Sequence, residues 1–283
     1  MPDARKSLDV LANEWESCSK CDLGVRRHDP TVNGRLVFGG GVTGGMMFIG
    51  DGPGSKESDS GRAFVDSSGK FLRFILGKLK MEDNYFTNAV ICRSCAHVFD
   101  SLGRPLFMHN GNQRIKDEPP TPAQSAACSA RLMEQIYIVD PVLIVTLGPE
   151  AAAILTGKPV SATMLNDRGT FRQIDVPGVW RNAVVTEKKK QWVRKVKGVI
   201  SAPTEQNYVQ YLAMLATHPS YALRYVKDNR KKNVFSDFCL DVQKAVHVYK
   251  RYLYEIDSSR GTNTQDINTT LNMDELEEYV AEL

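Results

Sequence analysis

Four short apolar runs constrain the fold of this chain more than any other feature of its sequence. Each run is rich in Val, Ile, Leu, Phe or Met and stops at a turn-forming or polar residue, which is typical of a buried parallel strand. Amphipathic helical patterns separate the runs, and parallel strands need such crossovers between them. The sequence therefore predicts an α/β fold, a three-layer α/β/α sandwich with a central four-stranded parallel sheet. The predicted strands are residues 46–50, 85–91, 141–148 and 211–219.

The predicted helices carry start signals of their own. Ser68 is a candidate cap for a helix over residues 68–80. Thr121 followed by Pro122 predicts the start of a longer helix, whose pattern runs to residue 139. The remaining helices are predicted at 148–157, 220–228 and 236–255.

Three stretches interrupt this alternation and set the predicted domain limits. Residues 1–256 are expected to form one domain, with polar surface insertions at about 96–120 and 186–208. Residues 257–283 are expected to form a flexible acidic tail that ends in a short helix. Such a tail could bind a protein partner or mimic DNA.

Composition and charge exclude some classes of protein. The hydrophobic fraction of 42% is enough for a sizeable core. No apolar run approaches the roughly 20 residues that cross a bilayer, and the N-terminal stretch lacks the apolar segment of a secretory signal. We therefore expect a cytoplasmic protein of a prokaryote or of a virus-infected cell, without a membrane partner. The net charge of +3 permits a polyanionic partner without requiring one.

The cysteines indicate a metal or cluster site. Cys18 and Cys21 form a C-x2-C pair, whose spacing lets two thiolates of one turn bind the same group. Cys92 and Cys95 would complete a structural zinc site of four thiolates. Cys92 and Cys128 would serve equally well, and local sequence leaves this choice open. Cys239 lies on an apolar helical stripe and is interpreted as a core residue.

A single acid, Asp51, lies in the turn "GDGPG" that ends the first predicted strand. Gly52, Pro53 and Gly54 let the backbone approach a ligand closely, and the two glycines offer N–H groups as donors. His218 follows the last predicted strand, and open α/β sheets bind ligands beyond the carboxyl ends of their strands. The residues alone leave open whether Asp51 is a catalyst or a cap.

Several motifs in a fixed order resemble those of the family 4 uracil-DNA glycosylases, the iron–sulfur type of thermophilic bacteria and archaea. The similarity runs from Cys18 to about Arg224. The family patterns G-E-A-P-G-x-x-E and G-x-P-F correspond to "GDGPGSKE" and "GRAF", and T-N-x-x-K-C-R-P corresponds to "TNAVICRS". "TPAQSAAC", "PVLIVTLG", the Arg168–Gly169 pair and "HPSYALR" follow in the order that the family shows.

The resemblance implies an activity and a cofactor. Residues 1–256 would form a uracil-DNA glycosylase-like domain, which flips deoxyuridine out of DNA and hydrolyses the N-glycosylic bond in base excision repair. The resemblance favours Cys18, Cys21, Cys92 and Cys128 as ligands of a structural [4Fe–4S] cluster, with Cys95 as a bystander. Zinc remains the alternative.

The resemblance also assigns roles at the base-binding site. Gly50 and Gly52 would line it, Phe64 would stack on uracil, and Asn88 would read the Watson–Crick edge of the base. His218 would donate a hydrogen bond to uracil O2 as negative charge develops there.

Two acids are candidates for orienting the attacking water. Asp51 stands where the family has Glu, one methylene shorter, and Glu57 matches the later acid of the motif. Either carboxylate would also offset the positive charge of the oxocarbenium-like sugar.

Two further segments are expected to contact DNA. Pro53 and Gly54 would approach the flipped nucleotide, while Ser220, Tyr221 and Arg224 would lie on a loop that enters the minor groove. A basic run contributes a possible phosphate clamp, with Trp192 available to stack on a base. Its first lysines are Lys188, Lys189 and Lys190.

A second reading keeps the fold but not the reaction. Because Asp51 replaces a Glu, the chain could instead be a non-catalytic or altered-specificity DNA-binding member of the same superfamily. In either case the protein is expected to be a monomer.

Overall fold

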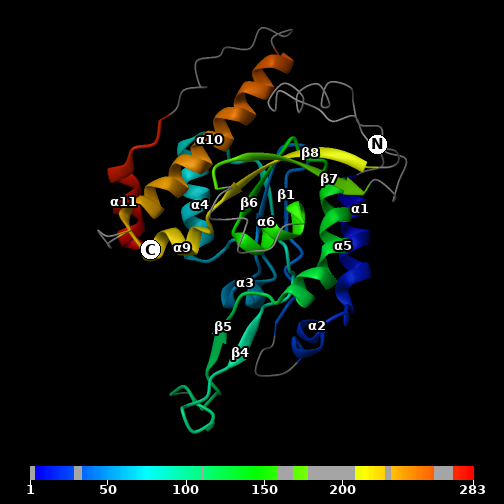
Figure 1. Ribbon diagram of the computed structural model, residues 1–283, viewed down its shortest axis with the longest axis vertical. Coiled ribbons are helices and arrows are strands. Elements are labelled where there is room, and N and C mark those ends of the chain that lie inside the picture. The colour runs from blue at the N-terminus through cyan, green and yellow to red at the C-terminus, as the bar shows by residue number, and fades with distance from the viewer. Residues whose placement is uncertain are drawn as a thin grey trace.

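The computed structural model describes residues 4–28, 34–109, 111–157, 168–177, 208–226, 231–257 and 270–283. Helices alternate with strands over most of this length (Figure 1). The helices are α1 (Ala4–Glu16), α2 (Asp22–Arg26), α3 (Ser55–Ser60), α4 (Ser67–Lys78), α5 (Pro122–Val139), α6 (Pro149–Thr156), α9 (Pro219–Arg224), α10 (Lys232–Asp257) and α11 (Met273–Glu282). The strands are β1 (Gly40–Gly41), β2 (Met46–Gly50), β3 (Asn84–Asn88), β4 (Cys95–His97), β5 (Ile115–Asp117), β6 (Leu143–Leu147), β7 (Phe171–Pro177) and β8 (Tyr208–Ala216).

The main sheet has the order β1-β3-β2-β6-β8-β7 among the described residues. Its four central strands, β3, β2, β6 and β8, are mutually parallel, which confirms the predicted parallel core. The prediction missed one antiparallel strand at each edge, β1 beside β3 and β7 beside β8. The strand predicted at 85–91 ends earlier, at Asn88, where the chain turns towards the cysteines.

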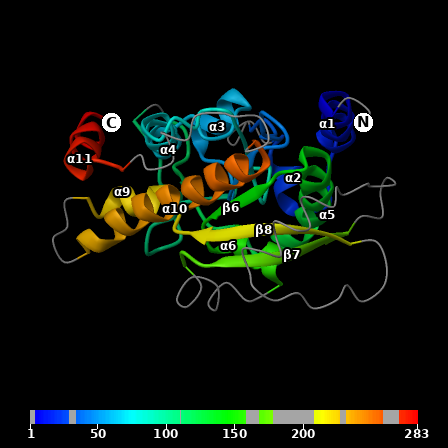
Figure 2. The same ribbon diagram turned by 90° about the horizontal axis from the view of Figure 1, so that it is seen from above.

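The two faces of the sheet are covered by different helices, as the predicted sandwich requires. Figures 1 and 2 show α4, α9, α10 and α11 on one side of the sheet and α1 and α5 on the other. Along β2, Met46 and Phe48 face the first group, whereas Met47 and Ile49 face the second. This alternation follows from the two-residue period of a strand, and it divides the core into two layers.

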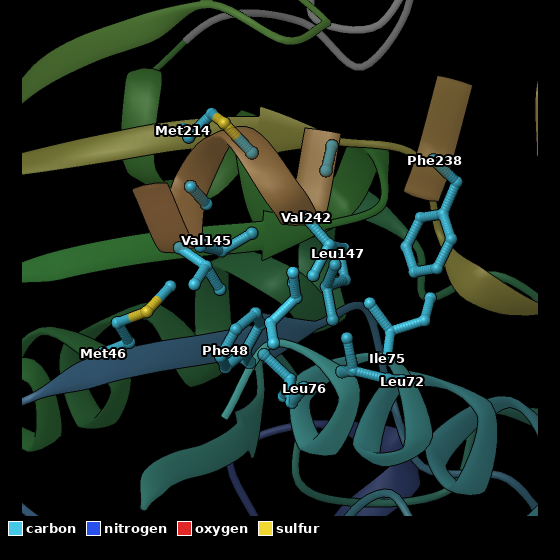
Figure 3. Close-up of a cluster of buried hydrophobic side chains, with 14 of the residues drawn as sticks. Met46, Phe48, Leu72, Ile75, Leu76, Val145, Leu147, Met214, Phe238 and Val242 are labelled. Carbon is cyan, nitrogen blue, oxygen red and sulfur yellow. The ribbon is translucent and has the colours of Figure 1, made fainter. Parts of the chain in front are cut away.

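The core under α4 and α10 is the larger of these layers. Figure 3 shows Phe48, Val145 and Met214 of three parallel strands meeting Ile75 of α4 and Val242 of α10. Cys239 belongs to the same cluster and is fully buried, which confirms its interpretation as a core residue.

Helix starts follow the expected chemistry, with one correction. α5 starts where Thr121 and Pro122 predicted it, and Thr121 also forms a reciprocal capping box with Gln124. The predicted cap Ser68 is wrong, because Asp66 caps α4 by accepting a hydrogen bond of 2.8 Å from the Ser67 N–H. An Asp is as strong a cap as a Ser, and it stands where the backbone is still extended.

Of the three stretches that interrupt the predicted alternation of strands and helices, the first and the last differ in structure. Residues 96–120 contain the antiparallel ribbon β4–β5, which Figure 1 shows extending away from the sheet. The end of the C-terminal segment folds as α11 against α4, with Leu276 buried and the Tyr279 ring 3.8 Å from that of Phe74. This corrects the expectation of a flexible tail for that helix, because its apolar side chains are used in packing. The basic run with Lys188, Lys189 and Lys190 lies outside the described residues.

Candidate functional site

The carboxyl ends of the parallel strands form one row across the sheet. Gly50, the last residue of β2, pairs with Asn88 of β3 on one side and with Leu147 of β6 on the other. Leu147 in turn pairs with Ala216 of β8. The residues that follow these four positions therefore emerge at the same edge, where open α/β sheets bind their ligands. They include Asp51 and His218.

Asp51 makes its main contact with the N-terminus of α6. Its Oδ1 accepts a hydrogen bond of 2.9 Å from the Ala151 N–H, and the Glu150 N–H also stabilises its charge. Burial outweighs these contacts and raises the pKa of Asp51 from 3.8 to about 7. The carboxylate is therefore both a helix cap and a group that titrates near neutral pH.

Gly148 makes room for that carboxylate. Its φ of 119° lies in the region that favours glycine, and a Cβ at this position would collide with the Asp51 side chain. The Gly148 N–H also donates to the Ala216 carbonyl at 3.0 Å. One glycine at the end of β6 thus connects the exits of β2 and β8.

Glu57 braces the loop around the site. Its Oε2 accepts a hydrogen bond of 2.7 Å from the N–H of Gly54, the residue immediately before α3. The backbone N–H groups of Phe64 and Val65 bond to the same carboxylate, while burial raises the pKa of Glu57. The geometry gives Glu57 a positioning role for Phe64.

Phe64 is held in an unusual conformation beside Gly50. Its φ is 56°, a left-handed value that a bulky residue rarely adopts, and its ring is buried. A side chain at Gly50 would collide with this ring and with the Asn88 carboxamide. Strain of this kind persists only where the surroundings enforce it, and the Glu57 contacts do so here.

Asn88 has an unsatisfied donor at the same place. The residue is 2% exposed, yet its Nδ2 has no hydrogen-bond partner among the described residues. A buried amide without a partner costs free energy, so this N–H is available to donate to a molecule bound beside it. The Phe64 ring and the Asn88 amide, brought together over Gly50, form a small site for a planar polar molecule.

A residue that the sequence analysis missed holds the backbone of Asn88 in place. Arg131 of α5 is fully buried, and its Nη2 donates to the carbonyl oxygens of Asn88 and Ala89 at 2.8 and 2.6 Å. Its Nη1 donates to Gln135, which also bonds to Thr87 at 3.0 Å. The only signal in the sequence was an Arg and a Gln four positions apart on an otherwise apolar helix face.

His218 caps α9 and presents a neutral imidazole. Its Nδ1 accepts a hydrogen bond of 3.2 Å from the Ser220 N–H and lies 2.7 Å from Ser220 Oγ. Burial, and then the charge of Arg224, lower the pKa of His218 to about 4. Because Nδ1 accepts, the proton of the neutral ring resides on Nε2, which is then a donor.

The remaining predicted DNA contacts lie around this edge. Tyr221 and Arg224 are exposed on α9, and the Tyr221 ring packs edge-on against that of Tyr225 at 4.9 Å. Gly54 is partly exposed in the turn, whereas Pro53 is buried and supports it.

Four cysteines gather behind the exit of β3. Cys92 and Cys128 are buried in one cluster with Trp15, and Cys18 and Cys21 pack against it. Burial raises the pKa of Cys92 to about 12, and the other three thiols add to this rise, as expected for close neighbours. Gln124 donates to Asp22 at 2.9 Å and so ties the C-x2-C turn to α5.

Cys95 stands apart from this group. It lies on β4, and burial raises the pKa of its thiol while Arg93 and Asp117 are its nearest charged neighbours. Within the described ranges no three Cys, His, Asp or Glu side chains stand close enough to share a single ion. A tetrahedral zinc site needs sulfurs within about 4 Å of one another, whereas a four-iron cluster spreads its ligands further apart.

The structure also contains a cavity of about 330 Å³ away from the strand ends. Arg62, Arg73 and Phe86 line it, together with Gly40 of the edge strand. Neither Asn88 nor Phe64 is among the residues that line it. None of the described helices has the length and apolar character that a membrane-spanning helix needs.

Comparison with known proteins agrees with this geometry. A sequence profile of the uracil DNA glycosylase superfamily matches residues 40–242. The type-4 uracil-DNA glycosylase of Thermotoga maritima is 31% identical over 159 residues, which cover 55% of this chain and 70% of that protein. The type-4 enzymes of Archaeoglobus fulgidus and Saccharolobus solfataricus are 33% and 32% identical, and the matches cover 53% and 54% of this chain. They span less than two thirds of those two relatives, 64% and 60% respectively. The chain belongs to the uracil-DNA glycosylase superfamily.

Proposed function

We propose that this protein is a uracil-DNA glycosylase, which hydrolyses the bond between uracil and deoxyribose and leaves an abasic site. The observation that carries the proposal is the unpartnered Nδ2 of Asn88 beside the buried Phe64 ring. That amide would donate to uracil O4 and its carbonyl would accept from uracil N3–H, while the ring stacks on the base. Thymine has the same edge, so its methyl group would have to be rejected by the close approach of the surrounding side chains.

Bond cleavage leaves negative charge on the base, and His218 is suited to stabilise it. A pKa of about 4 keeps the imidazole neutral at physiological pH, and Ser220 fixes Nδ1 as the acceptor. Nε2–H would then donate to uracil O2 without transferring its proton. The Gly52 N–H of the glycine-rich turn would supply a further donor, whereas the Gly54 N–H is already bonded to Glu57.

Asp51 would act on the sugar side of the bond. With a pKa of about 7, a large fraction of its carboxylate is ionised near neutral pH, although Ala151 occupies one oxygen. The other oxygen would orient the attacking water and offset the positive charge on the sugar. Glu57 would hold the turn and Phe64 in place without touching the reacting atoms.

The four grouped cysteines support a [4Fe–4S] cluster as the cofactor, held by Cys18, Cys21, Cys92 and Cys128. Arg131 fits this assignment, because its buried cation lies near these thiols and its Nε has no partner among the described residues. The cluster would supply structural cross-linking and no redox step. The zinc alternative needs Cys95, which lies among other neighbours.

Two measurements test the proposal. Anaerobically purified protein should contain iron, absorb visible light, and convert a uracil-containing oligonucleotide into an alkali-labile abasic product, with thymine and cytosine oligonucleotides as controls. Absence of product from iron-replete protein would refute the catalytic assignment, and a colourless zinc-loaded protein would refute the cofactor.

One observation favours a second candidate, a DNA-binding protein without glycosylase activity. Asp51 already caps α6, and in this second candidate its carboxylate has a structural role and takes no part in a reaction. The Asp51→Glu variant separates the two cases: activity that appears only in this variant assigns the natural chain to the non-catalytic class.

The remaining partners are inferred from the same surfaces. We infer that the protein acts as a monomer on DNA. A protein partner of the C-terminal segment would have to bind the acidic face of α11, because α4 covers its apolar face.

A further inference from the structure

The ribbon β4–β5 and the loops at its end form an arm beside the candidate site. We call the described residues 95–109 and 111–117 the β4–β5 arm. Figure 1 shows it extending past α2 and α3, on the side of the sheet where β2 and β3 end. At its base the Glu118 N–H donates to the Ser94 carbonyl at 3.0 Å, and the Pro120 ring lies against Gly52. The arm therefore starts next to the catalytic turn.

The end of the arm is folded. Backbone hydrogen bonds join Val98, Leu106 and Arg114 to one another. The Val98 N–H donates to the Arg114 carbonyl at 2.9 Å, the Leu106 N–H to the Val98 carbonyl at 2.9 Å, and the Arg114 N–H to the Leu106 carbonyl at 2.7 Å. The Asp100 carboxylate closes the first turn by accepting from the N–H groups of Leu102 and Arg104 at 2.8 and 2.9 Å. The arm presents its side chains from a preformed scaffold, which lowers the entropic cost of binding.

Those side chains include a concentrated apolar group. Phe99, Leu102, Phe107 and Met108 are 55%, 74%, 61% and 51% exposed. They make up four of the twelve large hydrophobic side chains that are exposed in the described structure, and all lie within ten positions. A contiguous exposed apolar group of this kind marks an interaction surface.

The charges around this group favour DNA over protein as the partner. The two acids of the arm are both paired, Asp100 with Arg104 of the arm at 2.7 Å and Asp117 with Arg93 at its base at 2.6 Å. Arg114 and Lys116 are exposed and form no ion pair among the described residues. The arm therefore presents an apolar end with unneutralised cations behind it. Proteins that wedge apolar side chains between base steps and hold phosphates with Arg and Lys show this combination.

We propose that the β4–β5 arm is a second DNA-contacting element, whose apolar end inserts into the duplex beside the flipped nucleotide while Arg114 and Lys116 bind phosphates. The inference rests on the proposed function, because the position of the arm matters only if DNA occupies the strand ends. The arm recognises stacked duplex DNA, since a single strand offers no base step to open.

The first experiment compares two substrates. The double variant Leu102→Ser, Phe107→Ser and the matched control Leu240→Ser, an exposed leucine on α10, are assayed on one uracil oligonucleotide as a single strand and as a duplex. Removing two side chains of the wedge predicts about a tenfold loss of kcat/KM on the duplex, with less than a twofold change on the single strand. Equal losses on both substrates would overturn the proposal, and Leu240→Ser should behave as the natural chain does.

The second experiment measures binding alone. The Kd for a duplex with a non-cleavable abasic analogue is followed by fluorescence anisotropy as a function of salt. The variant Arg114→Ala, Lys116→Ala should lower the slope of log Kd against log salt by about two, one unit for each phosphate contact. A slope that does not change in Arg114→Ala, Lys116→Ala would overturn the proposal. So would a variant Leu102→Ser, Phe107→Ser that binds the duplex as the natural chain does but has an altered sedimentation coefficient, because the apolar group would then contact protein. If the natural chain excises uracil from neither the single strand nor the duplex, the proposed function fails, while this binding test still decides on the arm.

Discussion

The exits of β2 and β3 lie side by side and end in register, yet they deliver side chains in opposite states. Asp51, after β2, has a carboxylate that already accepts hydrogen bonds from α6. Asn88, at the end of β3, has an amide nitrogen without a partner among the described residues. The Asn88 amide at the exit of β3 is therefore available to bind a ligand, whereas the Asp51 carboxylate at the exit of β2 both caps α6 and is the proposed catalytic group. Recognition of the base is expected to depend on one exit and the rate of cleavage on the other.

The largest loss of activity should follow from removing the unpartnered side-chain amide of Asn88. Asn88→Ala is expected to lower kcat/KM for uracil by about 10³-fold, because two hydrogen bonds to the base are lost. The melting temperature should change little, since Arg131 binds the backbone of Asn88 and not its side chain. Asn88→Asp serves as the control, because a carboxylate cannot donate to O4. Restored activity in Asn88→Asp would contradict the assigned contact.

A pair of substitutions at Asp51 separates its two roles. Asp51→Asn keeps an acceptor for the Ala151 N–H, whereas Asp51→Ala removes it. Both should lower kcat by about 10²-fold if the carboxylate orients water. Only Asp51→Ala should also lose about 1 kcal/mol of unfolding free energy, the usual value of a helix cap. Full activity of Asp51→Asn in a steady-state assay would make Asp51 a cap alone.

The pH dependence sharpens the same comparison. Because the pKa of Asp51 is about 7, kcat/KM should rise roughly tenfold between pH 6 and pH 8. His218, with a pKa of about 4, should add no step in this range. The Asp51→Asn profile should be flat and low. A rising limb that persists in Asp51→Asn would assign the ionisation to another group.

Protein stability should move in the opposite direction with pH. The folded-state pKa of Asp51 lies above its ordinary value of 3.8, so its contribution is fully present below pH 3.8 and is lost as pH rises through 7. Asp51→Asn should therefore be more stable relative to the natural chain at pH 8 than at pH 5, as urea unfolding at the two pH values would measure.

The smallest effect is expected far from both exits. Lys78 and Glu275 join α4 to α11 by an ion pair that is about 40% exposed on each side. Exposed pairs contribute about 0.2–1 kcal/mol, so Glu275→Ala should change unfolding free energy by no more than this and leave activity unchanged. Leu276→Ala is the matched variant for apolar packing, and its larger cost would show that α11 belongs to the fold. If neither variant changes the unfolding free energy, α11 does not contribute to the stability of the domain.

The parallel core could be predicted from sequence because each central strand lies in a short, largely apolar run that is buried on both faces. The edge strands could not: β1 is only Gly40 and Gly41, and β7 alternates like many half-exposed segments. Each of these two edge strands is defined by its hydrogen bonds to the neighbouring strand, β1 by those to β3 and β7 by those to β8. Burial on both faces leaves a signal in the sequence that pairing at an edge does not.

The site was predictable in its residue types and not in its hydrogen bonds. Asp51 could not be seen as a cap, because the Ala151 N–H lies a hundred positions away. The choice between Cys95 and Cys128 likewise depended on which of them folds against Cys92. Arg131 went unnoticed because a buried cation in an apolar helix is unusual, and its partners are backbone carbonyls that no motif encodes.

The position of the β4–β5 arm between Cys92 and Cys128 has a consequence for how this chain can change. The two cysteines lie in one buried cluster, so the ends of the intervening segment are held together whatever its length. The entropy of closing a loop grows only logarithmically, and doubling the segment would cost about 0.6 kcal/mol. Insertions can therefore accumulate here at little cost to the fold, and a glycosylase could acquire or lose reach along DNA without rebuilding the site that reads the base.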